Sequence, residues 1–181
     1  NNGGIKTIYP VFRREFSGHY GKIYGLDWSS NSELLVTAAQ DGKLIIWNPK
    51  MNTKCLAITL ESCWVMHCQF SPNIELIASG GLDNRITLHR INSDNIGESS
   101  KTIYGCLDNH QQYISCSRFI DDHNMLSASG DSTIIHWNLE LKRVTKTFKD
   151  HPADVMSIDV NPNNPSLFCS GSVDCTVRVW D

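Results

Sequence analysis

The chain has 181 residues, of which 40% are hydrophobic and 19% are charged, and its formal net charge is −3. This composition supports a folded domain with a sizeable core and excludes a disordered tail. The small net charge excludes a strong overall attraction to nucleic acid or to an anionic membrane, and no apolar run approaches the roughly 20 residues of a membrane-spanning helix.

Internal repetition is the main signal, and in chain order it gives four units. Four segments align on an aspartate: TAAQDGKLIIW, SGGLDNRITLH, SASGDSTIIHW and SGSVDCTVRVW. The anchors are Asp41, Asp83, Asp131 and Asp174, which are 42, 48 and 43 residues apart. This period matches the blade of a β-propeller better than the shorter ankyrin, tetratricopeptide or leucine-rich repeats. The longer second interval contains the polar stretch 92–100, which we interpret as an enlarged surface loop.

Each unit has the pattern of a β-hairpin. An alternating apolar run precedes the anchor and another follows it, as in LLVTA and KLIIW around Asp41. Such alternation is typical of strands, and the aspartate then lies at the tight turn between them. The sequence therefore predicts an all-β fold.

The residue types around each anchor also recur. A hydroxyl stands four positions before the anchor, an aromatic ring or a histidine stands six positions after it, and three units carry a histidine 21 to 23 positions before it. Because a buried aspartate needs donors, we expect a closed hydrogen-bond network in each unit. Its recurrence favours a structural role over a catalytic triad. The expected network residues are His19, Thr37, Asp41, Trp47, Ser79, Asp83, His110, Ser127, Asp131, Trp137, His151, Ser170, Asp174 and Trp180.

The cysteine pattern gives little support for a metal site. The seven cysteines include no CxxC pair, which favours free thiols in a reducing compartment. Cys63, His67 and Cys68 form the nearest approach to a metal cluster, but His67 and Cys68 point to opposite faces if they lie in a strand. We expect no metal and no cofactor.

An enzyme hypothesis has the pair His136 and Asp131 as its nearest candidate for hydrolase chemistry. His136 belongs to an alternating strand, and Asp131 is already used by the expected turn network. GxSxG, HExxH and GxxxxGK[ST] motifs are absent from the sequence. We therefore expect that the chain is not an enzyme.

The repeats resemble a known family. GHYGKIYGLDW with DGKLIIWN, NHQQYISCSRF with GDSTIIHWN, and DHPADVMSIDV with VDCTVRVWD resemble WD repeats, and the likeness covers residues 18–181. More narrowly, GKIYGLDW, LLVTAAQDGKLIIW, WVMHC, GGLDN, YISCSRF, SASGDST and DVMS resemble the β subunit of heterotrimeric G proteins, in that order. Asn109 in place of glycine, WN in place of WD in two units, and His89 in place of an aromatic ring depart from the consensus.

This resemblance implies a β-propeller whose family has seven blades and an N-terminal helix that coils against a γ subunit. The chain would then be a fragment with about four blades of a seven-bladed ring; a closed four-bladed ring is the alternative. Residues 1–17 are expected to form an N-terminal segment whose VFRREF stretch (11–16) is an outer strand that closes the ring. The four repeats are expected at about 18–60, 61–106, 107–150 and 151–181, with the last incomplete.

The stretch ESCWVM (61–66) places a tryptophan where the other units carry Lys22, Tyr113 and Asp154. Such variable side chains among recurring scaffold residues are what a composite recognition surface requires. By resemblance, the residues expected to contact the α subunit from the top face of the propeller are Lys22, Tyr24, Trp64, Val65, Met66, Leu82, Asn84, Tyr113, Asp154 and Met156. The alternative is that Trp64 fills a gap in the core.

The resemblance implies a signal-transducing G-protein β subunit. Its partners would be a GDP-bound α subunit, a γ subunit and effectors, with no nucleic acid. Its expected location is the cytoplasm, at the inner face of the plasma membrane, where lipidated partners hold it. The alternative is another WD-repeat scaffold or an adaptor of a multiprotein complex.

Overall fold

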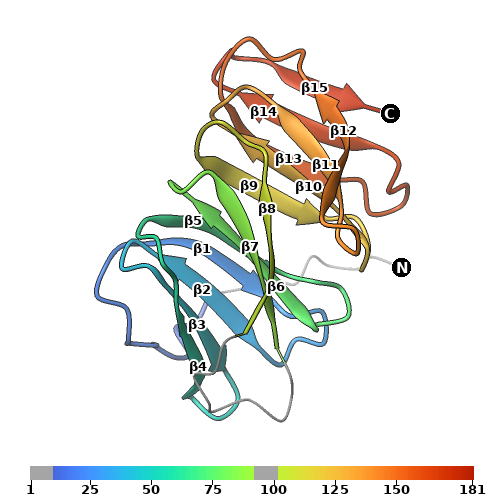
Figure 1. The fold of residues 1–181 in the computed structure, drawn as a ribbon. Helices are drawn as coiled ribbons and strands as arrows, with labels where there is room; N and C mark the ends of the chain where they lie inside the picture. The colour runs from blue at the N-terminus through green and yellow to red at the C-terminus, as the bar shows by residue number, and fades with distance from the viewer. Residues whose placement is uncertain (1–9, 92–101) are drawn as a thin grey trace, which may run out of the picture.

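A computed structural model describes residues 10–91 and 102–181, and all regular structure in these residues is β-strand. The strands form three antiparallel sheets of four strands and one of three, as the sequence predicts for blades of a propeller. Figure 1 shows the sheets following one another along the chain, from β1–β4 at the blue end to β13–β15 at the red end. The enlarged loop that we expect at 92–100 lies outside the described residues.

Each sheet, which we call a blade, contains strands in sequence order. Blade 1 consists of β1 (Ile23–Trp28), β2 (Leu35–Ala39), β3 (Lys43–Asn48) and β4 (Thr53–Thr59). Blade 2 consists of β5 (Val65–Phe70), β6 (Leu76–Gly81), β7 (Arg85–Arg90) and β8 (Ile103–Asp108). Blade 3 consists of β9 (Ile114–Phe119), β10 (Asn124–Ser129), β11 (Ile134–Asn138) and β12 (Arg143–Phe148). Blade 4 consists of β13 (Val155–Val160), β14 (Phe168–Ser172) and β15 (Val177–Trp180).

The hydrophobic core lies between neighbouring blades. Leu44 and Ile46 of blade 1 pack in one cluster with Val65 and Phe70 of blade 2. Similar clusters join blade 2 to blade 3 and blade 3 to blade 4. A blade therefore buries its faces against the neighbouring blades, and burial of this apolar area provides most of the stabilisation.

The hairpin turn at each anchor has the same geometry in all four blades. The residue after each anchor, Gly42, Asn84, Ser132 or Cys175, has a φ between 64° and 73°. Its amide donates to the carbonyl three residues earlier, at 3.2 to 3.4 Å. A turn that ends in a left-handed residue is a common hairpin connection. The predicted position of the aspartate at the tight turn is confirmed.

The expected outer strand at residues 11–16 is not a strand in this structure. The outer strands β4, β8 and β12 each pair with a neighbour in their own sheet, and residues 11–16 have no such ladder. Instead, the Arg14 guanidinium donates to the carbonyls of Pro49 and Lys50, and the Phe16 ring lies 5.3 Å from the Trp47 ring. Within the described part of the chain, no helix has the length and apolarity that crossing a bilayer requires.

Candidate functional site

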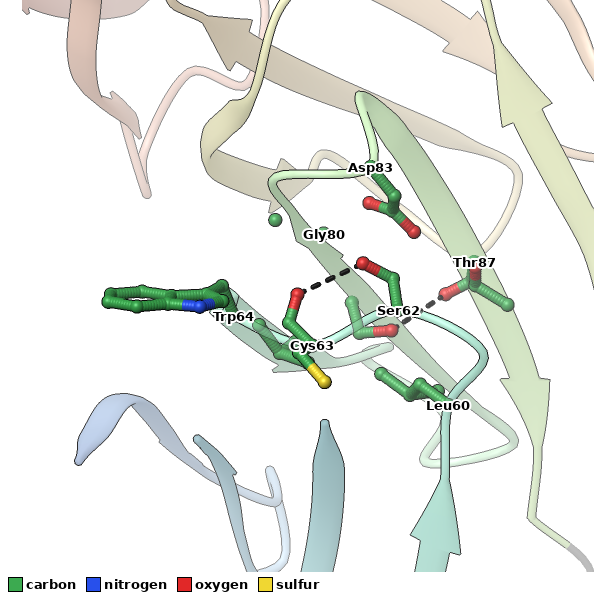
Figure 2. Close-up of a pocket in the computed structure, with 10 residues that line it drawn as sticks. Leu60, Ser62, Cys63, Trp64, Gly80, Asp83 and Thr87 are labelled. Atoms are coloured by element: carbon green, nitrogen blue, oxygen red, sulfur yellow. Dashed lines mark hydrogen bonds between the residues drawn. The ribbon is translucent and has the colours of Figure 1, made fainter. Parts of the chain in front are cut away.

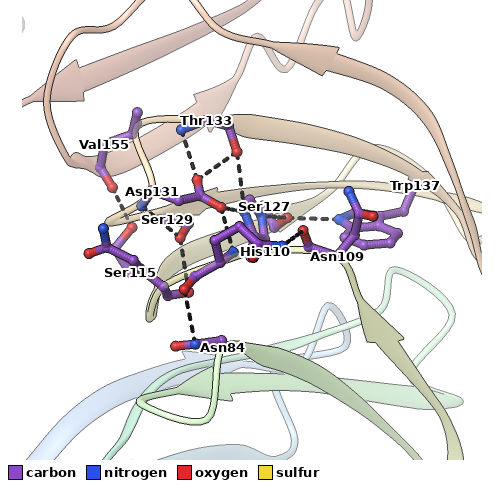
Figure 3. Close-up of polar contacts among 12 residues, drawn as sticks. Asn84, Asn109, His110, Ser115, Ser127, Ser129, Asp131, Thr133, Trp137 and Val155 are labelled. Atoms are coloured by element: carbon purple, nitrogen blue, oxygen red, sulfur yellow. Dashed lines mark hydrogen bonds and ion pairs between the residues drawn. The ribbon is translucent and has the colours of Figure 1, made fainter.

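A directed hydrogen-bond network surrounds the anchor of blade 3 (Figure 3). His110 Nδ1 lies 2.8 Å from Asp131 Oδ2, and its Nε2 lies 2.7 Å from Ser127 Oγ. Trp137 Nε1 donates to the same hydroxyl at 2.7 Å. Because the carboxylate only accepts, the ring donates to it from Nδ1, and Nε2 is paired with the Ser127 hydroxyl. The four side chains thus form one chain of bonds from Trp137 to Asp131.

The same arrangement holds in blades 1 and 4. His19 Nδ1 lies 3.1 Å from Asp41 Oδ2, and His151 Nδ1 lies 2.6 Å from Asp174 Oδ2. The hydroxyls of Thr37 and Ser170 complete these networks, and each accepts from the indole of Trp47 or Trp180.

Electrostatics favour the ionised anchor. Burial alone would raise the pKa of Asp131, but hydrogen bonds from His110, Thr133 and the Gln111 amide outweigh it and hold that pKa well below its usual range. Thr133 belongs to the same hairpin, whereas His110 and Gln111 lie in the segment between β8 and β9, so the ionised carboxylate links the hairpin turn to that segment.

Blade 2 departs from this pattern. Asp83 is exposed, and Ser79 Oγ lies 3.4 Å from His89 Nε2, which occupies the position of the missing tryptophan. The expected network of Ser79 and Asp83 is therefore corrected, since no histidine bridges these two residues. Burial lowers the pKa of His89 to about 4, so its imidazole is neutral at neutral pH.

Just before each innermost strand, the backbone hydrogen bonding is the same in all four blades but the side chains differ. Lys22, Trp64, Tyr113 and Asp154 directly precede β1, β5, β9 and β13. Each backbone carbonyl accepts from the amide of the residue before an anchor, at 2.8, 3.3, 3.0 and 3.0 Å. The four positions are thus equivalent in hydrogen bonding, while their side chains are a cation, two aromatic rings and an acid. We call the end of the blades that carries them the top face.

A β-bulge follows each of these residues. The register of each innermost strand shifts at its second residue, so that Tyr24, Met66, Ser115 and Met156 have no partner in the ladder. A bulge changes the direction of a side chain and increases the local twist. Each blade therefore presents two side chains at the top face, one before the strand and one at the bulge.

Contacts between blades join these side chains into one surface. The Tyr24 and Trp64 rings are stacked between blades 1 and 2, and the Tyr113 hydroxyl donates to Asp154 Oδ2 at 2.7 Å between blades 3 and 4. The Asn84 amide donates to the Gln111 carbonyl at 3.2 Å between blades 2 and 3. The top face is therefore continuous across all four blades.

Most of the sequence-predicted contact residues are accessible there. Tyr24, Trp64, Leu82 and Met156 are 39%, 40%, 50% and 45% exposed. Lys22 is exposed too, and the half-buried members of the set are Met66, Asn84, Tyr113 and Asp154. The placement of Val65 in the contact set is corrected, because its side chain is only 3% exposed and packs in the core between blades 1 and 2.

Trp64 occupies a strained backbone position. Its φ is 62°, in the left-handed region that tryptophan rarely adopts. Its carbonyl lies so close to Gly81 that a Cβ there would collide with it. Figure 2 shows the ring of Trp64 pointing away from the small cavity beside Leu60, Asp83 and Thr87. The ring therefore does not fill this gap, and strain of this kind is concentrated at functional sites.

The catalytic and metal candidates are not brought together. His136 lies in β11, opposite Leu126, while Asp131 bonds to His110. Cys68 is buried in the core and Cys63 is exposed. Among residues 10–91 and 102–181, no three His, Cys, Asp or Glu side chains are placed to hold a metal ion.

Sequence reasoning missed Tyr20 and Lys43. Tyr20 is 89% exposed, and the ammonium of Lys43 lies 5.3 Å from the centre of its ring, beside the blade 1 anchor. Tyr20 directly follows the network residue His19, and this position is the sequence signal that could have found it. Tyr20 extends the top face at blade 1.

Comparison with known proteins places these blades in context. The family model described as WD domain, G-beta repeat matches residues 10–48, 53–90, 101–138 and 142–181. The chain is 38% identical over 175 residues to a guanine nucleotide-binding protein subunit beta of Arabidopsis thaliana, and 37% identical to those of Nicotiana tabacum and Solanum tuberosum. These alignments cover 93% of this chain and 46 to 47% of the relatives. The chain thus spans about half the length of the curated relatives it matches.

The matched repeats are out of phase with the blades. The segment 53–90 contains β4 of blade 1 followed by β5, β6 and β7 of blade 2, and the next two segments are offset in the same way. One repeat therefore contributes strands to two sheets, which links neighbouring blades through the covalent chain as well as through the core.

Proposed function

This chain belongs to the family of WD domain, G-beta repeat proteins, and we propose that it acts as a β subunit of a heterotrimeric G protein, which binds a GDP-loaded α subunit and effectors through its top face. In this proposal the four blades belong to a seven-bladed ring that also binds a γ subunit. The proposal goes further than a WD-repeat scaffold, and two kinds of observation support it.

The observation that carries the proposal is the contrast between two sets of positions, the turn networks of blades 1, 3 and 4 and the residues before the innermost strands. The turn networks repeat nearly the same side chains, whereas the residues before β1, β5, β9 and β13 differ in charge and size. Aromatic and methionine side chains that are accessible together, among charged groups, have the composition of binding hot spots. The likeness to G-protein β subunits across 93% of the chain supports the choice of partner.

Binding at one shared face gives the mechanism. An α subunit that covers Trp64, Tyr24 and Tyr113 excludes an effector that needs the same side chains. Release of the α subunit then makes the face available, so signalling follows from competition and requires no chemistry by this chain. In the proposal the protein is cytoplasmic and reaches the inner face of the plasma membrane through lipidated partners.

A capture experiment tests this function. The full-length protein is expressed with a prenylated γ chain, and the complex is mixed with an α subunit loaded with GDP or with a non-hydrolysable GTP analogue. We expect a stable complex with the γ chain and retention of the GDP-loaded α subunit only. A protein that folds but takes up no γ chain would instead be another kind of WD-repeat scaffold.

A further inference from the structure

Blade 2 has a groove on its flank because two large side chains of the turn network are replaced. In the other blades a histidine packs edge-on against a tryptophan, with ring centroids 5.9 to 6.4 Å apart. In blade 2 His89 replaces the tryptophan, and the position of the bridging histidine is empty of any ring. A cavity of about 10 Å³ remains between Ser79, Asp83, Thr87 and Leu60 (Figure 2).

This cavity adjoins a much larger groove between blades 1 and 2, which we call the flank groove. Its volume is about 590 Å³, within the range of small-molecule sites. Asp83, Thr87 and Leu60 line both spaces. The main apolar and polar side chains of the flank groove are Leu56, Ile58, Ile103, His89, Thr102 and Cys106.

The acidic groups at the flank groove determine which ligand charge it favours. Glu61 and Asp83 are both exposed and line it, while Arg85 is paired with Asp108 at 3.1 Å. Cys106 lines the flank groove together with Arg85, Asp83 and Glu61, and burial raises the pKa of its thiol. Two carboxylates without a cationic partner among the described residues favour a positively charged ligand.

The buried end of the flank groove suits an aromatic ring. His89 is fully buried, and its ring nitrogens lie 3.4 Å from Ser79 Oγ and 3.5 Å from Thr102 Oγ1. In blades 1 and 3, the histidine Nε2 and the tryptophan Nε1 each lie 2.7 to 2.9 Å from the equivalent hydroxyl oxygen. His89 thus makes weak contacts with its neighbours, in a space that accommodates an indole in the other blades.

We propose that the flank groove is a binding site for a small aromatic amine, whose ring lies among Leu56, Ile58 and Ile103 and whose ammonium group meets Glu61 and Asp83. The site is separate from the top face, so it does not depend on the function proposed above. It is specific to blade 2, because the tryptophans of the other three blades occupy this space themselves.

Protection of Cys106 tests the proposal. In the full-length protein with Cys63→Ser and Cys175→Ser, alkylation of Cys106 by iodoacetamide is followed with and without tryptamine. At ten times its Kd, tryptamine should slow alkylation about tenfold, since only about one site in eleven then stays free. Indole-3-propionate has the same ring and the opposite charge, and it should give no protection.

Two variants complete the test. His89→Trp fills the flank groove and should abolish protection, while capture of the α subunit stays unchanged. Glu61→Gln with Asp83→Asn alters only exposed groups and should weaken tryptamine binding about fivefold, which keeps the test valid if His89→Trp does not fold. Equal protection by indole-3-propionate, no protection at millimolar tryptamine, protection only by a Trp-Lys peptide, or unchanged protection in both variants would each overturn the proposal.

Discussion

The ring of Trp64 in blade 2 stacks on the ring of Tyr24 in blade 1, with centroids 5.9 Å apart and planes inclined at 22°. Each ring covers one face of the other and leaves about two fifths of each residue exposed. The pair thus forms a flat aromatic platform across the blade boundary. Such a platform can anchor a partner without being needed for the core.

Trp64→Ala should separate binding from folding. Because Trp64 is partly exposed and outside the core clusters, its loss should change the free energy of unfolding by about 0.5 kcal/mol. Binding of the α subunit should weaken by roughly 2 kcal/mol, or about thirtyfold. A thermal melt and a titration on the same sample measure the two effects.

Trp28→Ala is the matched control. Trp28 is 51% exposed and stands at the far end of β1 from the top face. Trp28→Ala should leave the affinity for the α subunit unchanged. An equal loss of affinity in both variants would mean that Trp64 is not a specific anchor, and a loss of about 3 to 5 kcal/mol of stability in Trp64→Ala would show it to be a core residue.

Asp131→Asn and Asp83→Asn should differ sharply in stability. Asp131 accepts from His110, Thr133 and the Gln111 amide, so its replacement should cost about 1 to 3 kcal/mol. Asp83 is exposed, and its only hydrogen bond among the described residues is a long one of 3.5 Å from the Arg85 amide, so its replacement should stay within about 0.5 kcal/mol. Urea titration of both variants decides, and equal midpoints would contradict the network.

The loss of stability at low pH should depend on the protonation of Asp131. The folded pKa of Asp131 is below its unfolded value near 3.9, so its stabilisation is complete above about pH 4. It is lost as the pH falls from there toward the folded pKa. In Asp131→Asn this loss should be smaller, which unfolding curves between pH 5 and 2 would measure.

Exchanging residues at the hairpin turns should have opposite effects in two blades. Ser132 has a φ of 68°, so Ser132→Gly should relieve strain and stabilise the protein by about 0.5 to 1 kcal/mol. Gly42→Ala introduces strain at the equivalent position, and its Cβ would lie 2.9 Å from the Ser62 carbonyl oxygen. It should destabilise the protein by about 1 kcal/mol or more. Differential scanning calorimetry of both variants would show whether the signs differ.

Mild acid should act through His67 and His89. Burial lowers the pKa values of His67 and His89 to about 4, whereas the unfolded chain takes up these protons near pH 6.5. The unfolded state therefore binds more protons in between, and stability should fall as the pH drops from 6.5 to 4. His89→Gln cannot titrate there and should show a shallower fall. An identical pH dependence would mean that His89 is protonated in the folded protein.

The sequence predicted the blades well because their determinants are local. The position of each anchor, the alternation around it and the hydroxyl four residues earlier all lie within one hairpin, as Asp131 and Ser127 illustrate. The outer strand expected at residues 11–16 stays a prediction, because a strand needs a neighbour for its ladder and these residues have none among the described strands.

Two features of the top face were beyond the sequence pattern. The bulges at Tyr24, Met66, Ser115 and Met156 depend on the hydrogen-bond register, which side-chain alternation does not encode. Val65 was assigned to the contact set by resemblance, although alternation along β5 could have indicated that it faces the opposite way from its neighbours. The structure therefore shows which way the side chains face at positions that the sequence could only identify.

The bulges also have a consequence for how such a protein diversifies. A bulged residue makes no ladder pair, so a substitution there places few demands on the neighbouring strand. Tyrosine, methionine or serine can then be exchanged at these four sites with little effect on the ladder, whereas the anchors of blades 1, 3 and 4 are constrained by their buried partners. Partner choice and foldability can thus evolve independently within a single 40-residue unit of the chain.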